Sequence, residues 1–349
     1  MIGHRGASGI LPEHTKEGFA LALEMGVDAL EVDLAMCKDG ALILRHDLYL
    51  SNSTNIASFP KFKDRKTIRT LQGKPVSDWF ICDFTLEELK ELRVKQVFED
   101  RPQEHNYKYS LTTLSELIDQ IKAYPKTKPI QLFLEIKNAS FHHRNNLNIE
   151  DQTLKVLNKH GWNNAESPVY IESFEVSNLK KIRTESKVKL VQLIDADLLN
   201  HKGELVYDNQ FGAPDDFGKY NDARNYGDLI SNKGLDEIKT YAQAIGVWKP
   251  YIVSYNGEER TNLVATNLIE RAHQRNLQVF AYSFRNEWYR LPLEYKNDPI
   301  NEYLHFFNLG IDGVFTDFPD TAQQALSKFE ESIKEEESFF YQLKKRFGF

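Results

Sequence analysis

Eight short segments rich in β-branched and aromatic residues recur along this chain, and helical patterns separate most of them. The segments cover residues 1–5, 29–35, 131–137, 169–174, 189–195, 244–247, 278–284 and 312–317. Strands that alternate with helices form parallel sheets, because each crossover helix returns the chain to the same edge. Eight such units predict an α/β fold, a closed (β/α)8 TIM barrel whose functional residues lie at the carboxyl ends of its strands.

The connections between the predicted strands differ greatly in length. An Asp-Gly turn at residues 39–40 predicts a hairpin that carries His46 back to the end of the second strand. Residues 51–113 and 196–236 are much longer than ordinary loops, and long insertions in barrels usually lie at the functional rim. We predict a barrel over residues 1–325, with an insertion at about 51–113 after strand two, and a C-terminal helical extension over residues 326–349.

The predicted C-terminal helix has one apolar stripe. Its residues recur at roughly helical spacing: Leu326, Phe329, Ile333, Phe340, Leu343 and Phe347. Docking on the barrel is favoured over a membrane-surface or partner helix. No segment approaches 18 uninterrupted apolar residues, so no membrane insertion is expected. A secretory leader is either absent or removed before Met1.

Composition limits the classes of partner and leaves the compartment open. The 51 acidic and 44 basic residues give a net charge of -7, without the basic stripe of a nucleic-acid-binding protein, so nucleic acid is excluded as a partner. Cys37 and Cys82 have neither metal-finger spacing nor a disulfide framework, although one bridge between them stays open. The sequence does not determine the oligomeric state.

Carboxylates alternate with apolar residues in two of the predicted strands. Along the second strand the apolar side chains share one face, so Glu31 and Asp33 share the other, and the third strand places Glu135 and Lys137 in the same way. In a barrel these faces point inward, where three ionised carboxylates are costly and repel one another. A divalent cation would compensate, and oxygen ligands suit Ca²⁺ or Mg²⁺. The alternative is pairing with Arg5, Lys137 or backbone donors and no metal.

Two histidines are expected at the same rim. His4 ends the first strand, and His46 ends the hairpin beside the second. Imidazoles gain and lose protons near neutral pH, and Arg5 and Lys137 add fixed positive charge suited to phosphate oxygens. A histidine pair, a cation site and two basic side chains together indicate hydrolysis of a phosphate ester.

The motifs along the chain resemble those of the glycerophosphodiester phosphodiesterase family, most closely its larger bacterial, periplasmic, calcium-dependent branch. The matching segments, in family order, are HRGASGILPEHT (4–15), LEVDLAMCKDGALILRHDLYL (30–50), LEIKNASFHH (134–143), YIESFE (170–175), KLVQLI (189–194), AYSFRNE (281–287) and GVFTDFPDTA (313–322). The resemblance covers nearly the whole chain. It implies metal-dependent cleavage of deacylated phospholipids, a small-molecule substrate, into glycerol 3-phosphate and an alcohol.

The resemblance also implies a role for each matching residue. It assigns acid-base catalysis to His4 and His46, phosphate binding to Arg5 and Lys137, and metal binding to Glu31, Asp33 and Glu135. Family members form a cyclic phosphate with the substrate's glycerol hydroxyl, and water then opens it. His4 is expected to be the acid and His46 the base in the first step, with their roles exchanged in the second. Calcium is the expected ion, and magnesium is the alternative. The resemblance also implies a periplasmic or secreted protein, with the cytoplasm as the alternative compartment.

Several further residues near the predicted site carry open alternatives. Phe174 and Tyr282 either fill the barrel or form a wall for the glycerol or alcohol group. Glu172 stands where many family members carry glutamine, and it adds negative charge near the phosphate site. His14 is expected to support its turn, and Asp317 to tie the last strand to Arg5 or to a turn.

Two other functions remain possible for the predicted barrel. Related phospholipase D-type toxins and phosphoinositide-specific phospholipases act on intact lipids, but residues 51–66 and 196–228 are polar, which favours a water-soluble substrate. A surface-binding protein on a catalytically weak barrel would not require the intact set of histidines and acids.

Overall fold

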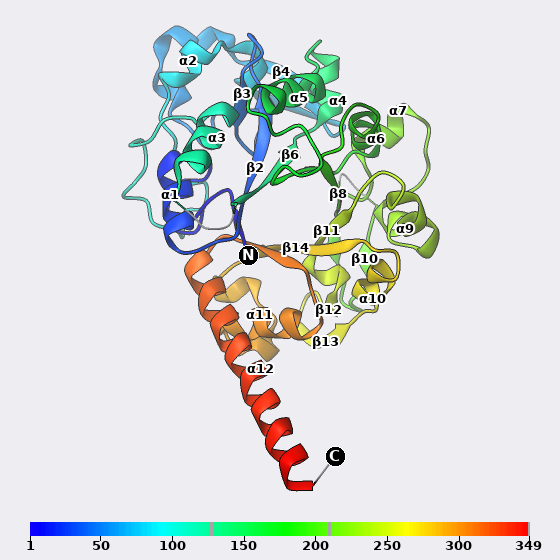
Figure 1. The fold of residues 1–349 in the computed structure, drawn as a ribbon. Coiled ribbons are helices and arrows are strands. Elements are labelled where there is room, and N and C mark those ends of the chain that lie inside the picture. Colours follow the sequence, from blue (N-terminus) through cyan, green and yellow to red (C-terminus); the bar gives the residue numbers. More distant parts are fainter. Residues whose placement is uncertain (126–128, 209–210, 348–349) are drawn as a thin grey trace.

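The computed structural model of the protein describes residues 1–125, 129–208 and 211–347, and the chain forms the predicted closed barrel (Figure 1). β1 pairs with both β15 and β2, which closes the ring. The parallel strands, in spatial order, are β1 (Ile2–His4), β15 (Gly313–Thr316), β14 (Gln278–Phe284), β11 (Ala244–Trp248), β8 (Lys189–Ile194), β7 (Val169–Ser173), β6 (Gln131–Ile136) and β2 (Ala29–Met36).

Helices and short hairpins surround the barrel and extend its rim (Figure 1). The helices are α1 (Lys16–Glu24), α2 (Leu86–Lys90), α3 (Leu114–Ala123), α4 (Ala139–Arg144), α5 (Ile149–Lys159), α6 (Val176–Glu185), α7 (Asp215–Lys219), α8 (Tyr226–Leu229), α9 (Asn232–Ile238), α10 (Leu268–His273), α11 (Pro299–Asn308) and α12 (Pro319–Phe347). The other strands are β3 (Leu42–Leu44), β4 (Thr67–Leu71), β5 (Lys74–Asp78), β9 (Leu198–Leu199), β10 (Leu205–Val206), β12 (Val253–Asn256) and β13 (Thr261–Ala265).

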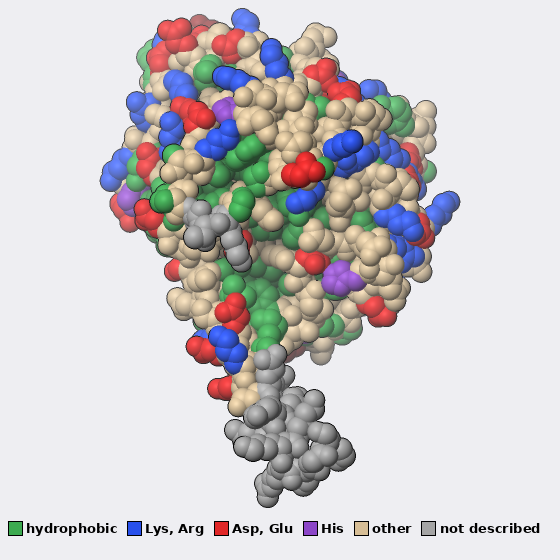
Figure 2. Space-filling model, viewed as in Figure 1, with side chains coloured by type: hydrophobic (Ala, Val, Ile, Leu, Met, Phe, Trp, Pro, Cys, Tyr) green, Lys and Arg blue, Asp and Glu red, His purple; other side chains and the backbone are tan. Residues whose placement is uncertain are grey.

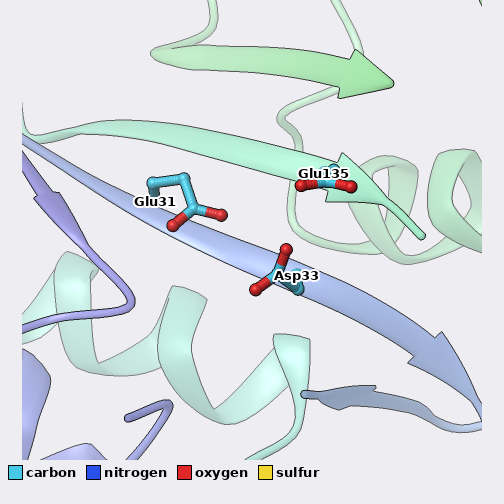
Figure 3. Close-up of side chains that lie close together, drawn as sticks. All are labelled: Glu31, Asp33 and Glu135. Carbon is cyan, nitrogen blue, oxygen red and sulfur yellow. The ribbon is translucent and has the colours of Figure 1, made fainter. Parts of the chain in front are cut away.

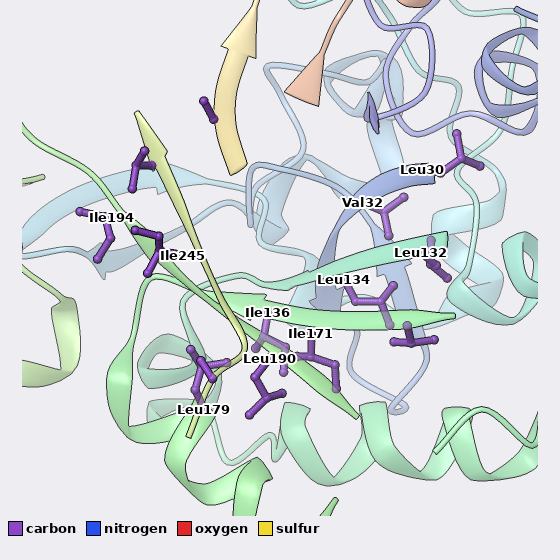
Figure 4. Close-up of a cluster of buried hydrophobic side chains, with 14 of the residues drawn as sticks. Leu30, Val32, Leu132, Leu134, Ile136, Ile171, Leu179, Leu190, Ile194 and Ile245 are labelled. Carbon is purple, nitrogen blue, oxygen red and sulfur yellow. The ribbon is translucent and has the colours of Figure 1, made fainter. Parts of the chain in front are cut away.

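The barrel strands have two differently used faces, as their alternation predicts. Outward side chains such as Leu132 and Leu134 pack in a continuous apolar layer between the strands and helices such as α6 (Figure 4). Inward side chains form an aromatic floor at the amino-terminal end, where Phe133 stacks on Tyr170 with ring centroids 4.5 Å apart. Two residues further along β2 and β6, the inward positions hold carboxylates. The floor therefore supports a polar layer above it.

The insertion after strand two folds around an apolar cluster of its own. β3 pairs antiparallel with β2, as the Asp-Gly turn predicts, and the chain then forms the β4–β5 hairpin and α2. Phe62, Phe80 and Phe84 are buried at the centre of this cluster. Cys37 and Cys82 are both free thiols, so the bridge that the sequence left open is not formed.

α12 begins at Pro319, a residue type that favours the first turn of a helix. Its first turns pack on the barrel, since Ala322 and Ala325 are buried and the Phe329 ring lies 5.5 Å from that of Phe307. The later turns extend away from the barrel in Figure 1. The side chains predicted at Phe340, Leu343 and Phe347 lie outside the described part of the chain.

The distribution of charged side chains on the surface agrees with the absence of a basic stripe in the sequence. Figure 2 shows one face, on which acidic and basic side chains are interspersed. Among the described residues, no helix is both long enough and apolar enough to cross a bilayer.

Truncating the aromatic floor tests this account of the barrel. Phe133 is fully buried and contacts Tyr170, Phe280 and Phe315, so Phe133→Ala should lower the free energy of unfolding by about 3–5 kcal/mol. Denaturant titration measures the change. The control is Ile68→Ala at a side chain 73% exposed, which should stay within about 0.5 kcal/mol of wild type. Equal losses in both variants would contradict the proposed role of the floor.

Candidate active site

A cavity of about 810 Å³ opens at the carboxyl ends of the barrel strands. Eight of the nine predicted site residues line it: His4, Arg5, Glu31, His46, Glu135, Lys137, Phe174 and Tyr282. The ninth, Asp33, is 1% exposed and lies beneath the cavity surface, beside Glu135 in the strand register. Residues from five separate segments of the sequence thus meet in one place.

Three inward carboxylates lie close together on β2 and β6 (Figure 3), and two of them, Glu31 and Glu135, line the cavity. Glu31 and Asp33 project from β2 and Glu135 from β6, and one oxygen of each lies within 4.8 Å of the others. The Asp33 Oδ1 atom is buried without a hydrogen-bond partner among the described residues. Buried carboxylate oxygens in such a group need a positive partner, and all-oxygen ligation fits a hard dication.

Two basic side chains already balance part of this negative charge. The Nε atom of Arg5 lies 3.1 Å from Asp33 Oδ2, and its NH1 donates to Glu13 at 2.8 Å. The Nζ atom of Lys137 lies 2.8 Å from Glu135 and 3.3 Å from Asp33 Oδ1. Both side chains also border the cavity, where they would meet an anion.

The acids of this site differ strongly in pKa. Burial, followed by the nearby charge of Asp33, raises the pKa of Glu31 well above its usual value. Burial likewise raises the pKa of Glu135 to about 8, although Lys137 opposes the shift. Burial alone would also raise the pKa of Asp33, but Lys137 and Arg5 hold it well below the ordinary range. The protein charges therefore stabilise only one of the three carboxylates as an anion.

His4 lies between the acids and the last strand. Its Nδ1 atom is 2.5 Å from Asp317 Oδ1, and its Nε2 is 3.8 Å from Glu31 Oε2. Burial, followed by the positive charge of Arg5, lowers the pKa of His4 to about 4. Of the two partners predicted for Asp317, Arg5 is wrong, because the carboxylate binds His4, Arg101 and Arg285. The tie to a turn is present, since the Asp317 carbonyl accepts from Gly9 N at 2.8 Å in the turn after β1.

His46 has a similar arrangement after the hairpin strand β3. Its Nδ1 atom lies 2.9 Å from Asp47 Oδ1, which leaves Nε2 as the nitrogen available to a bound molecule. The side chain is 39% exposed at the cavity mouth. Desolvation there, followed by the charges of Arg5 and Lys137, lowers its pKa. Each histidine thus has a carboxylate behind it.

The turn after β1 supplies supporting residues that the sequence did not reveal as such. His14, expected only to support its turn, has φ 60° and also holds Asp33 Oδ2 with its Nε2 at 2.8 Å. Glu13 accepts from Arg5 and from the buried Arg45. The proline-glutamate-histidine sequence drew attention to this turn, but no local pattern indicated which side chains these residues would contact.

The inner wall of the cavity contains a further acid and two aromatic rings. Glu172 on β7 pairs in register with Glu135, and its Oε2 is buried without a hydrogen-bond partner in the described chain. Tyr282 donates to the carbonyl of Ile194 at 2.7 Å, and its ring lies 6.0 Å from that of Phe174. Both rings border the cavity, and their role as a wall for the glycerol or alcohol group stays a prediction.

Comparisons with known proteins show the family of the chain. A model of the Glycerophosphoryl diester phosphodiesterase family matches residues 4–321. Glycerophosphodiester phosphodiesterase GDPD6 of Arabidopsis thaliana is 35% identical over 91% of this chain and 83% of its own. A glycerophosphodiester phosphodiesterase of Haemophilus influenzae is 34% identical over 93% of this chain and 89% of its own.

Solved structures share the fold. A putative glycerophosphoryl diester phosphodiesterase of Silicibacter pomeroyi superposes with a TM-score of 0.64 at 21% identity, covering 94% of this chain and 92% of its own. An Oleispira antarctica phosphodiesterase in complex with the product sn-glycerol-3-phosphate has a TM-score of 0.61 at 19% identity, covering 93% and 96%. With a family match over most of its length and relatives above 30% identity, the chain belongs to the glycerophosphoryl diester phosphodiesterase family and is an enzyme of that class.

Proposed function

We propose that this enzyme cleaves soluble glycerophosphodiesters into glycerol 3-phosphate and an alcohol, using His4 and His46 as an acid-base pair above a divalent cation. The observation that carries the proposal is the arrangement of two carboxylate-backed histidines over three acids in one cavity. The product complex of the Oleispira antarctica phosphodiesterase, a protein of the same fold, supports glycerol 3-phosphate as the product.

In the first step, His46 takes the proton of the substrate's neighbouring glycerol hydroxyl, and that oxygen attacks phosphorus. The bond from phosphorus to the alcohol oxygen breaks, and His4 gives that oxygen a proton. A five-membered cyclic phosphate remains. Asp47 and Asp317 keep each Nδ1 hydrogen-bonded, so that proton transfer takes place at Nε2.

In the second step the two histidines exchange roles. His4, now without its proton, accepts one from water, whose oxygen attacks phosphorus and opens the ring. His46 returns its proton to the glycerol oxygen that leaves. The protons balance over the cycle, and both histidines regain their starting states. Lys137 and Arg5 border the cavity on the side of the acids, where they would orient the phosphate oxygens.

Glu31, Asp33 and Glu135 would hold the cation. When bound, it neutralises charge on the phosphate oxygens and stabilises the charge that develops during displacement. We propose calcium, since three carboxylates from two strands suit an ion that accepts six to eight oxygens at about 2.3–2.6 Å. Magnesium is the alternative.

Cation binding can be measured apart from catalysis. Glu135→Gln should weaken calcium binding at least about tenfold in isothermal titration calorimetry, because it removes one charged ligand. The control is Glu150→Gln, a buried acid that pairs with His143 outside the cavity. Affinity should fall as the pH drops below about 8, since the ion then displaces a proton from Glu135. Unchanged affinity in Glu135→Gln would place the ion elsewhere.

The reaction itself is tested with glycerophosphocholine. We expect release of glycerol 3-phosphate that stops after exhaustive chelation and returns with added calcium, because the charge that develops on the phosphate oxygens then lacks the cation that would neutralise it. A coupled assay for glycerol 3-phosphate measures the rate, and magnesium in place of calcium compares the two ions. Activity that survives chelation would remove the cation from the mechanism, and cleavage of intact phospholipid alone would favour the lipase alternative.

Removal of one histidine tests the acid-base pair. His46→Ala should lower kcat by about 100- to 10,000-fold, because it removes the general base. The circular dichroism spectrum should stay unchanged, because His46 is partly exposed at the cavity mouth and contributes little to the core. His273→Ala is the matched control, since His273 pairs with Asp312 at the other end of the barrel and should keep full activity. A near-normal rate in His46→Ala would assign the base to another group.

A further inference from the structure

A buried carboxylate at the end of β15 connects a catalytic histidine to the insertion. Asp317 is 1% exposed, and its Oδ1 lies 2.5 Å from His4 Nδ1. Its other oxygen, Oδ2, accepts from Arg101 at 2.7 Å and from Arg285 at 2.9 Å. The two oxygens of this carboxylate thus have different partners. Oδ1 contacts the histidine, and Oδ2 is fixed by two guanidinium groups.

Arg101 belongs to the insertion, and its guanidinium group has several contacts besides Asp317. It is 5% exposed, and its Nε binds Glu287, just after β14, at 2.7 Å. Its guanidinium lies over the Phe98 ring at 4.3 Å from the centroid. The NH1 group donates to the Ser8 carbonyl at 3.3 Å. The planar group is therefore fixed in orientation as well as in position.

The same part of the insertion also supports the backbone next to His4. Gln96 donates from Nε2 to the Ser8 carbonyl at 3.0 Å, and the Ser8 hydroxyl donates to the His4 carbonyl at 2.8 Å. Arg101 and Gln96 thus converge on Ser8, four residues after the histidine. The insertion acts on His4 through its ring and through its backbone.

From these contacts we infer that the insertion positions His4 for proton transfer, with Arg101 as the positioning residue that acts through Asp317. This inference rests on the proposed function. The Arg101–Asp317 pair keeps the Asp317 carboxylate aligned with Nδ1, so Nδ1 of His4 stays protonated and hydrogen-bonded while Nε2 faces the cavity for proton transfer. Arg285 contacts the same oxygen but has a side chain 19% exposed, against 2% for Arg101. The more deeply buried arginine provides the stronger constraint.

His46 has a weaker version of this arrangement. Asn52, at the beginning of the insertion, donates to Asp47 Oδ2 at 2.9 Å, and Asp47 holds His46. This hydrogen bond is exposed and its donor is uncharged, so it fixes the Asp47 carboxylate less firmly than Arg101 fixes that of Asp317. The insertion therefore touches the carboxylate behind each histidine but fixes that of His4 more firmly.

Kinetics of three variants test the inference. Arg101→Met removes the charge and keeps the aliphatic stem, and Arg101→Lys keeps the charge without the planar fork. Arg93→Met is the control, because Arg93 lies in the same insertion and donates to the carbonyls of residues 90–92. With saturating calcium and glycerophosphocholine, Arg101→Met should lower kcat by about 10- to 100-fold with KM within about threefold of wild type. Arg101→Lys should be intermediate and Arg93→Met unchanged.

A spectroscopic readout separates positioning from simple stabilisation. In ¹⁵N-histidine spectra, the neutral form of wild-type His4 should be the Nδ1-protonated tautomer, and Arg101→Met should populate both tautomers. Calcium affinity should stay unchanged, since Arg101 contacts none of the three acids. The inference is overturned if Arg101→Met lowers the melting temperature but keeps the kcat and the His4 signal of the wild-type enzyme. If Arg101→Met does not fold, Asp317→Asn replaces it, and wild-type kcat in that variant overturns the inference equally.

The same assays distinguish failure of the inference from failure of the proposed function. A wild-type enzyme inactive on glycerophosphodiesters, or a fully active His4→Ala, would refute the function and with it the inference. An active wild type, an inactive His4→Ala and an unchanged Arg101→Met would refute the inference alone.

Discussion

Burial of several carboxylates inside a barrel is the constraint on which the rest of this structure depends. Glu31, Asp33 and Glu135 face inward because their apolar neighbours are needed in the layer beneath the helices. The cost of removing these charges from water is reduced by Arg5 and Lys137, which must themselves be held in place. The turn after β1 holds Arg5 through Glu13, and Arg45 of the hairpin in turn holds Glu13.

Strand alternation made much of the fold and site predictable. The inward acids, the Asp-Gly hairpin and the eight strands follow from patterns within a few residues, where side-chain period and turn chemistry determine the outcome. The partners of Asp317 did not follow. Arg101 lies 216 residues away in sequence, and a contact between an insertion loop and the last strand leaves no periodic trace. A carboxylate with several arginines in reach pairs according to tertiary geometry alone.

The insertion illustrates how local composition can mislead. Residues 51–66 at its beginning are polar in composition, yet the insertion folds around a phenylalanine cluster and extends from there to the barrel rim. A loop without its own core could not hold a buried arginine against the end of β15. The conformational entropy lost on ordering such a loop would exceed the free energy gained from the contact. The apolar cluster therefore makes the contacts at the active site possible.

The aromatic floor closes the described barrel beneath the cavity. Phe133, Phe280 and Phe315 fill its amino-terminal end, while His46 lines the cavity at the opposite, carboxyl end of the strands. In the proposed mechanism, the departing alcohol and the incoming water would occupy the same space above phosphorus. A second alcohol that attacked the cyclic phosphate in place of water would exchange one headgroup for another, so the same cavity geometry would favour transfer at high alcohol concentration.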